Sequence, residues 1–312
     1  MNRIIWITGA AGFIGGAATR YFSENGWRVI GFDRQRPEAT LPSTAFHVAP
    51  IEDWILEAAL KAHGKPDVVF HAAGTGTVGQ AQANPEKSRR DTVGTTTAIL
   101  NTLGREAPGT RILYPSSAAV YGNAGGSAAL AEDRALSPAS VYGQDKQEVE
   151  RLCTLAGQEG RLSIGVVRFF SVYGPGLRKQ LPWDLGKKLL TQTAGATLFG
   201  TGQETRDFLN IADAIQLIAH LATHTFTGTR IVNGGTGLAT TIADFAGMMA
   251  TALGQSTPIA FSGETKAGDP THMRADTTKL HALGFQPRVT LGPGLQEYAD
   301  WIKAETLAEA KP

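Results

Sequence analysis

The stretch Thr8-Gly9-Ala-Ala-Gly12-Phe-Ile-Gly15 constrains the fold of this chain more than any other feature. It follows a short apolar run, Arg3–Ile7, and leads into an amphipathic run, Phe13–Glu24. Glycines at this spacing allow a sharp turn, close approach of the backbone to a pyrophosphate, and tight packing of a helix against a strand. The start of that helix offers free N–H groups to the phosphates. The pattern predicts a strand, a phosphate-binding loop and a helix.

The first half of the chain repeats this alternation of short apolar and longer amphipathic runs. Further buried strands are predicted at Arg28–Phe32, Val68–His71, Arg111–Tyr114 and Ser163–Arg168. Helices are predicted at Ile51–Ala62, Glu86–Leu103 and Val141–Gln158. Such alternation builds right-handed βαβ units, and the resulting parallel sheet binds ligands beyond the carboxyl ends of its strands. We therefore expect an α/β fold with a doubly wound parallel sheet.

The second half is less regular, because proline and glycine interrupt it repeatedly between residues 175 and 202. Helical patterns return at Ile211–Ala222, Thr241–Leu253 and Leu295–Ala310. We expect residues 1–168 to form a nucleotide-binding domain. Residues 169–312 should form mainly a smaller substrate-binding domain, partly interleaved with the first.

Asp33 closes the predicted second strand and is the residue that bears on cofactor choice. A carboxylate at this place accepts hydrogen bonds from the adenosine ribose hydroxyls and repels a 2′-phosphate, which favours NAD over NADP. Arg34 and Arg36 follow it. Arginines just past this strand can hold a 2′-phosphate or remain solvated, so NADP stays open as an alternative. NAD is the expected cofactor.

Composition excludes several other classes of protein. The formal net charge of +1 gives no electrostatic argument for nucleic acid or an anionic membrane surface. Cys153 is the only cysteine, which rules out an intrachain disulfide and favours a reducing compartment. No run approaches the roughly 18 apolar residues of a membrane span, and the one close histidine pair, His220 and His224, has no third ligand at metal-like spacing. We expect a cytoplasmic protein without a metal.

Tyr142 and Lys146 place a phenol and an ammonium one helical turn apart on the same face. A serine-rich strand end containing Ser117 lies 25 residues upstream of Tyr142. Removing hydride from a carbinol carbon requires removing the hydroxyl proton, and a nearby ammonium favours the phenolate that can take it. Ser117 would hydrogen-bond the same substrate oxygen. These residues predict a catalytic group of Tyr142, Lys146 and Ser117.

With these motifs, the chain resembles an extended short-chain dehydrogenase/reductase of the NAD-dependent epimerase/dehydratase family, which contains UDP-glucose 4-epimerase. The resemblance runs from Thr8 to about Pro287 and implies a Rossmann-type fold. It is carried by Thr8–Gly15, Asp33, His71-Ala-Ala-Gly74, Ser116-Ser-Ala-Ala-Val-Tyr-Gly122, Tyr142–Lys146, Arg168-Phe-Phe-Ser-Val-Tyr-Gly-Pro175, Arg206-Asp-Phe208 and Ala275-Asp276.

The resemblance also implies roles for individual residues. Tyr142 would be the general base, Lys146 would bind the nicotinamide ribose, and Ser117 would be the partner hydroxyl. The residues expected to contact NAD are Gly9, Gly12, Phe13, Ile14, Gly15, Asp33, Arg34, Ile51, Ala72, Ala73, Gly74, Tyr142, Lys146 and Phe170. Those expected to contact a nucleotide-diphosphate sugar are Ser117, Ser171, Arg206 and Arg274, with the two arginines on the diphosphate.

Three positions depart from the family pattern. Pro50 stands where an aspartate usually contacts adenine after the third strand, which shifts that contact to Ile51 or Glu52. The usual Asn-Val-x-Gly-Thr run reads Asp91-Thr-Val-Gly-Thr95. Ser171 replaces the usual asparagine in the substrate pocket, which affects substrate identity more than reaction type.

The expected reaction is 4-epimerisation of a nucleotide sugar by transient oxidation at C4. Dehydratases commonly carry an Asp-Glu pair directly after the active-site Ser or Thr, whereas this chain has Ala118-Ala119. An NAD(P)H-dependent reductase of 4-keto sugars would use the same three residues, and a non-catalytic nucleotide-binding protein of the same fold is a further alternative. By analogy with the family we expect a homodimer formed through the helices containing Tyr142 and Glu86–Leu103.

Overall fold

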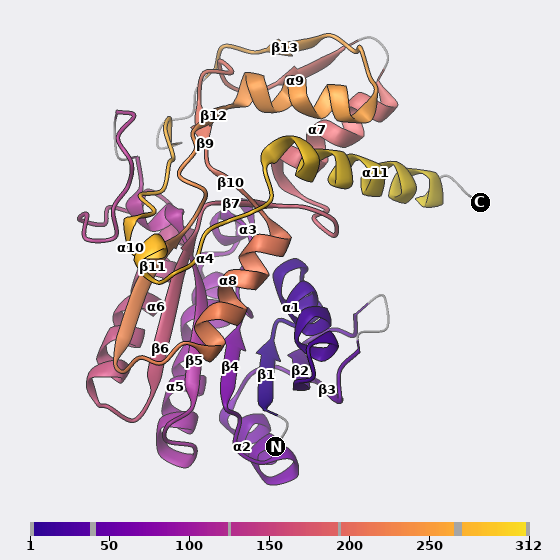
Figure 1. Ribbon diagram of the computed structural model, residues 1–312. Helices are drawn as coiled ribbons and strands as arrows, with labels where there is room; N and C mark the ends of the chain where they lie inside the picture. Colours follow the sequence, from indigo (N-terminus) through magenta and orange to yellow (C-terminus); the bar gives the residue numbers. More distant parts are fainter. Residues whose placement is uncertain (1–2, 38–41, 124–125, 193–194, 265–269, 310–312) are drawn as a thin grey trace. The chain divides into compact units, whose positions relative to one another are not determined.

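The computed structural model describes residues 3–37, 42–123, 126–192, 195–264 and 270–309 (Figure 1). The chain divides into two compact units. The first comprises Met1–Gly122, Arg134–Phe169 and Ile215–Val232, and the second comprises Asn123–Asp133, Phe170–Ala214 and Asn233–Pro312.

The first unit contains a parallel sheet and the helices that cover it. Its elements are β1 (Ile4–Thr8), α1 (Phe13–Glu24), β2 (Arg28–Asp33), β3 (Ala45–Val48), α2 (Asp53–His63), β4 (Val68–His71), α3 (Val78–Ala83), α4 (Pro85–Arg89), the π-helix η1 (Arg90–Gly94), α5 (Thr95–Glu106), β5 (Arg111–Ser117), the 3₁₀-helix η2 (Ala118–Tyr121), α6 (Val141–Gln158) and β6 (Ser163–Phe169). Helix α8 (Ile211–Thr223) and strand β11 (Thr229–Gly234) are shared by both units.

The sheet has seven strands in the order β11-β6-β5-β4-β1-β2-β3. Strand β1 lies between β2 and β4, with Ile5 opposite both Val29 and Val68. The strand order reverses beside β1, and in a doubly wound sheet this switch point opens a crevice at the carboxyl ends of the strands. The α/β Rossmann-type prediction is confirmed.

Helices pack on both faces of this sheet because side chains alternate between the faces along each strand. On one face Trp6, Ile30 and Tyr114 form a core with buried residues of α2, α5 and α6. On the other face α1 and α8 lie close together, where the Tyr21 hydroxyl meets Gln216. Figure 1 shows α1 and α8 in front of the strands and α5 and α6 behind them.

Strand β5 is longer than the predicted Arg111–Tyr114, since it continues through Pro115 to Ser117. Proline lacks the N–H that a central strand needs, so the sequence pattern predicts an end before it. Beyond Leu113, however, β5 pairs with β6 and no longer with β4. Pro115 therefore lies where one side of the strand is unpaired, and the extension makes Ser117 the last residue of the strand.

The helix predicted at Glu86–Leu103 is divided into α4, η1 and α5. The π-helical turn spans Arg90–Gly94, and the hydroxyls of Thr95 and Thr96 donate to the carbonyls of Asp91 and Thr92. Such back-bonding by threonine competes with the regular helical ladder. π-turns within helices often occur at functional sites.

Two strands of the seven-stranded sheet were not predicted from the hydrophobic pattern. The resemblance alone implied β3, which has four residues and is only partly buried. Strand β11 was not predicted, and three of its six residues are only partly buried. Short, partly exposed strands give a weak periodic signal.

The second unit is built from short strands and three longer helices. Its elements are β7 (Ser171–Tyr173), α7 (Gln180–Thr191), β8 (Ala196–Leu198), β9 (Thr205–Arg206), β10 (Phe208–Asn210), β12 (Thr240–Thr241), α9 (Ile242–Leu253), β13 (Ile259–Phe261), α10 (Thr278–Ala282) and α11 (Leu291–Glu309). Helix α11 confirms the predicted final helix and begins earlier than Leu295, while the predicted end at Ala310 lies outside the described residues.

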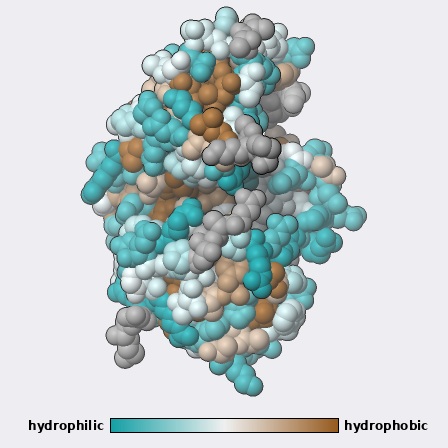
Figure 2. Space-filling model, turned by 90° about the vertical axis from the view of Figure 1, so that its right-hand side faces the viewer, coloured by the Kyte–Doolittle hydropathy of each residue, from teal (hydrophilic) through white to brown (hydrophobic). Residues whose placement is uncertain are grey.

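No helix in the described ranges is long and apolar enough to cross a membrane. Hydrophilic residues cover most of the face in Figure 2, and hydrophobic residues gather there in separate small patches.

Candidate active site

The glycine loop joins β1 to α1 at the carboxyl edge of the sheet. Gly9 has φ of +67°, and a Cβ there would lie 2.7 Å from the Ala72 carbonyl carbon. A Cβ on Gly15 would lie 2.1 Å from the Gly9 oxygen. Neither position accepts a side chain without movement, so the loop packs directly against β4 and the start of α1.

The same loop leaves the start of α1 open to an anion. Gly12 is the exposed N-cap residue and supplies no side-chain cap, and the first turn of α1 carries no acidic residue. Phe13 and Ile14, which follow it, are partly exposed. Uncapped N–H groups and the helix dipole attract phosphate. The loop thus fits the pyrophosphate of a dinucleotide. Gly9, Gly12 and Gly15 lie in this loop and at the start of α1, where the sequence pattern predicted them.

Asp33 ends β2 next to this loop. Its Oδ2 accepts a hydrogen bond from Ala11 N–H at 3.0 Å and its Oδ1 accepts one from Gln35 N–H at 3.2 Å. Each carboxylate oxygen can accept a further bond. The side chain is therefore fixed by the backbone and retains acceptors for ribose hydroxyls.

Buried polar side chains fix the end of β4. His71 is fully buried, and its Nδ1 and Nε2 lie 2.7 Å from Thr8 Oγ1 and 2.9 Å from Thr96 Oγ1. Burial, with the charge of Lys146 adding to it, lowers the pKa of His71 to about 3, so the ring is neutral. Ala73 N–H donates to Thr8 Oγ1 at 3.2 Å. This chain of bonds sets the backbone after β4.

The expected cofactor residues of this region lie at the same edge of the sheet. Ala72, Ala73 and Gly74 follow β4 and are partly exposed. A Cβ on Gly74 would lie 3.3 Å from Thr92 Oγ1. Ile51 is buried after β3. Phe170 belongs to the second unit.

Tyr142, Lys146 and Ser117 come together in the first unit. Tyr142 lies in the first turn of α6, whose Ser140 cap accepts a bond from Gly143 N–H. The Ser117 hydroxyl accepts a bond from Ala119 N–H at 3.2 Å, and it lies close enough to the Tyr142 phenol to influence its pKa. The Lys146 ammonium donates to the Pro115 carbonyl at 2.9 Å and lies 5.7 Å from the centre of the Tyr142 ring.

The two titratable groups of this cluster have shifted pKa values. Burial raises the pKa of Tyr142, although the bond from Ser117 opposes the shift. Burial lowers the pKa of Lys146 to about 8, while the negative charge of Glu150 acts in the opposite direction. The ammonium is thus charged at neutral pH, but it loses its proton more readily than an exposed lysine.

Gly143 brings α6 close to the end of β5. A Cβ on Gly143 would lie 2.6 Å from the Ala119 carbonyl oxygen. Any side chain here would push the helix away from the turn that carries Ser117. The close packing of α6 against this turn therefore requires glycine at position 143, which the sequence pattern did not predict.

A buried ion pair lies one helical turn beyond Lys146. Glu150 accepts from Ser116 Oγ at 2.5 Å and from Arg168 Nη2 at 2.7 Å, and both charged side chains are 4% exposed. Arg168 Nη1 also donates to the Tyr121 hydroxyl at 3.0 Å. Removing one partner of such a pair leaves an uncompensated buried charge. The pair joins α6 to β5 and β6 next to the cluster of Ser117, Tyr142 and Lys146.

The remaining substrate candidates lie in the second unit. Thr205 forms a parallel bridge with His272, so Arg206 and Arg274 stand on neighbouring segments. Ser171 lies opposite Phe208 in the β7–β10 pair. The Nε of Arg274 is buried with no hydrogen-bond partner among the described residues. The structure therefore places Ser171, Arg206 and Arg274 in one region of this unit.

Asp207 organises that region. Its carboxylate is fully buried and accepts bonds from the N–H groups of Thr236, Gly237 and Ala275 at 2.7, 2.8 and 3.1 Å. Burial raises its pKa even though these bonds oppose the shift. Asp207 thus joins the segments that carry Arg206 and Arg274.

Sequence reasoning assigned no role to Asp207, Glu150 or Arg168. Signals for them existed: Asp207 and Arg168 lie within the quoted motifs, and Glu150 follows Lys146 at a spacing of four. A charged residue in a buried strand or on a buried helix face usually needs a partner. The sequence does not say which partner it has.

A glycine loop at the switch point of a parallel sheet, with a Ser-Tyr-Lys cluster on the neighbouring strand and helix, defines a dinucleotide-binding α/β protein of the short-chain dehydrogenase/reductase type. Residues 5–235 match the model of the NAD-dependent epimerase/dehydratase family. The chain belongs to this family, and its cofactor is NAD. The predicted resemblance is confirmed.

Three similar proteins illustrate the match. A protein from Bacillus subtilis named uncharacterized UDP-glucose epimerase YtcB is 28% identical, with 93% of this chain and 95% of the relative covered. MoeE5 in complex with UDP-glucuronic acid and NAD has a TM-score of 0.87 at 27% identity, covering 97% and 100%. UDP-glucuronic acid 4-epimerase from Bacillus cereus has a TM-score of 0.85 at 27% identity, covering 97% and 99%.

Proposed function

We propose that this chain is an NAD-dependent nucleotide-sugar 4-epimerase, with Tyr142, Ser117 and Lys146 as its catalytic group. The observation that carries the proposal is the grouping of Ser117, Tyr142 and Lys146, in which Ser117 influences the Tyr142 phenol and the Lys146 ammonium lies 5.7 Å from the centre of the Tyr142 ring. It is supported by similar proteins that are named as 4-epimerases or that bind a UDP-sugar together with NAD.

In this proposal Tyr142 moves the proton of the substrate hydroxyl at C4. NAD, when bound, would supply the acceptor and donor of hydride for the C4 carbon. Ser117 orients the hydroxyl, since its oxygen accepts from Ala119 N–H and its proton can be directed toward Tyr142 and the substrate. The Lys146 ammonium and the first turn of α6 both favour the phenolate form of Tyr142. Return of hydride to the opposite face of C4, with return of the proton from Tyr142 to the C4 oxygen, would give the C4 epimer.

Two residues next to Ser117 argue against dehydration. Ala118 and Ala119 form the start of η2, directly after the strand end. Elimination at C6 needs an additional acid and base, and alanine can transfer no proton. Epimerisation needs none beyond Tyr142, so the residues present are sufficient for it.

We further propose that Arg206 and Arg274 bind the diphosphate of the substrate and that Ser171 contacts the sugar. Guanidinium groups suit this task because they form paired hydrogen bonds with phosphate oxygens. The buried, unpartnered Nε of Arg274 is a donor that an oxygen of the ligand would satisfy. With a net charge of only +1, the chain must attract an anionic substrate through local arginines.

The test is to follow interconversion of UDP-glucose, UDP-GlcNAc and UDP-glucuronate with their C4 epimers by NMR. One series receives no cofactor and a second receives NAD equimolar with the protein. We expect turnover of at least one pair, and the preferred pair names the sugar. Absence of turnover in both series, with consumption of NADH or NADPH on a 4-keto sugar, would contradict epimerisation and assign a reductase.

Tyr142→Phe is the matched variant for this test. It keeps the ring and removes the hydroxyl that moves the proton. We expect the rate to fall by roughly a thousandfold, within the range attributed to general acid–base groups, while titration with NADH gives an unchanged dissociation constant. Wild-type rates in this variant would rule out the mechanism.

A further inference from the structure

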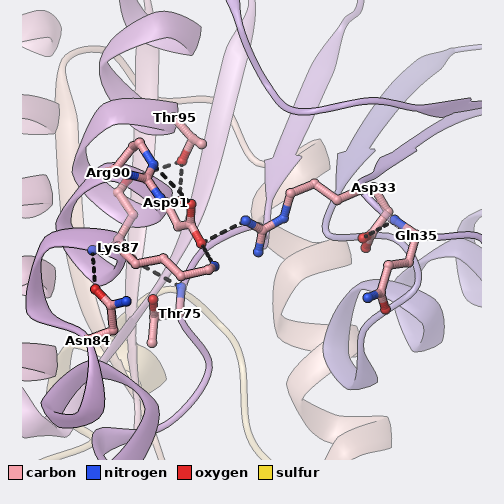
Figure 3. A network of polar contacts seen from close by, with 10 residues as sticks. Asp33, Gln35, Thr75, Asn84, Lys87, Arg90, Asp91 and Thr95 are labelled. Carbon is pink, nitrogen blue, oxygen red and sulfur yellow. Dashed lines mark hydrogen bonds and ion pairs between the residues drawn. The ribbon is translucent and has the colours of Figure 1, made fainter.

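Asp91 is a carboxylate on which several cations converge (Figure 3). Its Oδ2 accepts a hydrogen bond from Arg34 Nη1 at 2.7 Å and another from Lys87 Nζ, and Arg90 Nε lies 4.0 Å from Oδ1. The Asp91 side chain is 12% exposed, whereas those of Arg34 and Lys87 are 54% and 49% exposed. The carboxylate is therefore the fixed member, and the cations extend toward it.

The ion pair between Arg34 and Asp91 crosses the carboxyl end of β1. Arg34 follows the last residue of β2, on one side of β1. Asp91 precedes Thr92, whose hydroxyl accepts from Thr75 N–H beyond β4, on the other side of β1. Figure 3 shows Asp91, Lys87 and Thr75 on one side and Asp33 on the other. The glycine loop follows β1, so the pair lies in the crevice where the dinucleotide binds.

The cations of this cluster outnumber the carboxylates. Asp33 and Asp91 contribute two negative charges, and Arg34, Lys87 and Arg90 contribute three positive ones. Arg34 stands directly after the carboxylate expected at the adenosine ribose, which is where a cation for a 2′-phosphate would be placed. Its Nη1 donates to Asp91 instead, so this end of the guanidinium is directed to the carboxylate and not to a 2′-phosphate.

We propose that Asp91 determines the selectivity of this chain for NAD over NADP by holding Arg34 and Lys87 away from the 2′ position. Asp33 repels a 2′-phosphate directly, and Asp91 removes the cations that would otherwise compensate that repulsion. Selectivity then depends on two carboxylates, one at the ribose and one across the crevice. The inference rests on the dinucleotide site described above and not on the identity of the sugar.

The test is titration with NADH and NADPH by nucleotide fluorescence, which reads binding without turnover. Asp91→Asn keeps the shape of the side chain and removes its charge. We expect the ratio of NADPH to NADH affinity to rise at least tenfold, with NADH affinity changed less than threefold. Adding Arg34→Gln to this variant should abolish most of the gain. Asp300→Asn, an exposed substitution on α11 with the same change in net charge, should leave the ratio unchanged.

Arg34→Gln alone gives an independent test at an exposed residue. If Asp91 holds this arginine, the single variant should bind NADPH as weakly as the wild type does. Selective loss of NADPH affinity in Arg34→Gln would show that the arginine already serves the 2′-phosphate and would overturn the proposal. An unchanged affinity ratio in a folded Asp91→Asn variant would overturn it as well. Failure of the epimerase assignment would appear in the sugar assay and leave these ratios as they are.

Discussion

His71 is held by hydrogen bonds that have a fixed direction. Thr96 Oγ1 donates to the Thr92 carbonyl at 2.7 Å, so it accepts from His71 Nε2. The neutral ring carries a single proton, which Nε2 uses, so Nδ1 accepts from the Thr8 hydroxyl, whose oxygen also accepts from Ala73 N–H. A proton on Nδ1 would oppose the Thr8 donor and bring a buried charge near Lys146. The neutral ring therefore fits the hydrogen bonds that shape the loop after β4.

The burial of His71 predicts instability in acid. The unfolded chain takes up a proton on His71 near the ordinary pKa of 6.5, whereas the folded chain does so only at about 3. Above pH 6.5, His71 does not lower the free energy of unfolding. As the pH falls from 6.5 to 3, the free energy of unfolding decreases by up to about 1.4 kcal/mol per pH unit. His71→Asn, whose amide can both donate and accept, should show a shallower slope in urea unfolding between pH 6 and 4.

The control for this measurement is His281→Asn, at an exposed position on α10. It should leave the slope unchanged. Equal slopes in the wild type and in His71→Asn would mean that other groups account for the acid sensitivity.

Helix α1 contains two adjacent glycines that differ in their surroundings. A Cβ on Gly15 meets the Gly9 oxygen at 2.1 Å, whereas a Cβ on Gly16 meets the Ala10 oxygen at 3.4 Å, an ordinary contact. Gly15→Ala should shift the start of the helix, lower the free energy of unfolding by about 1–3 kcal/mol, and weaken NADH binding at least tenfold. Gly16→Ala should bind NADH normally and gain up to about 1 kcal/mol from helix propensity. Urea unfolding and NADH titration measure both effects, and equal behaviour of the two variants would contradict this account of the loop.

Elements with a strong local pattern were predicted well. Val68–His71, Phe13–Glu24 and Val141–Gln158 have the bounds expected for them. Their hydrophobic period and flanking glycines are local properties, which a sequence contains. The extension of β5 through Pro115 was not predicted, because it depends on which neighbour each part of the strand has. The π-turn at η1 depends on threonine hydroxyls that bond within the helix.

The candidate site shows the same division between local and non-local information. Gly9, Asp33, Ser117, Tyr142 and Lys146 were found because their spacing follows the order of strands and helices. The pairings Arg34–Asp91 and Glu150–Arg168 join residues 57 and 18 positions apart. Complementary charges in a sequence allow many pairings, and only the fold selects one. The sequence thus indicated the residues that we propose as reacting groups, and it did not indicate the groups that support them.

At the scale of the whole molecule, the expected ligand residues divide between the two units. The glycine loop and Asp33 belong to the first unit, and Arg206 and Arg274 belong to the second. A ligand that binds only the native state raises the free energy of unfolding by RT ln(1 + [L]/Kd), about 2.7 kcal/mol at a hundredfold excess over Kd. NADH and UDP should therefore each raise the melting temperature when added alone.

The two effects should be separable by single substitutions. In Gly15→Ala we expect the shift caused by NADH to be largely lost and the shift caused by UDP to remain, because the clash is confined to the loop and α1. In Arg206→Gln we expect the reverse, since we propose that this guanidinium binds the diphosphate of the substrate and not the dinucleotide. Differential scanning fluorimetry with each ligand across its Kd measures both. A full UDP shift in Arg206→Gln would remove this arginine from the diphosphate site, and loss of both shifts in either variant would mean that the substitution acts on the fold as a whole.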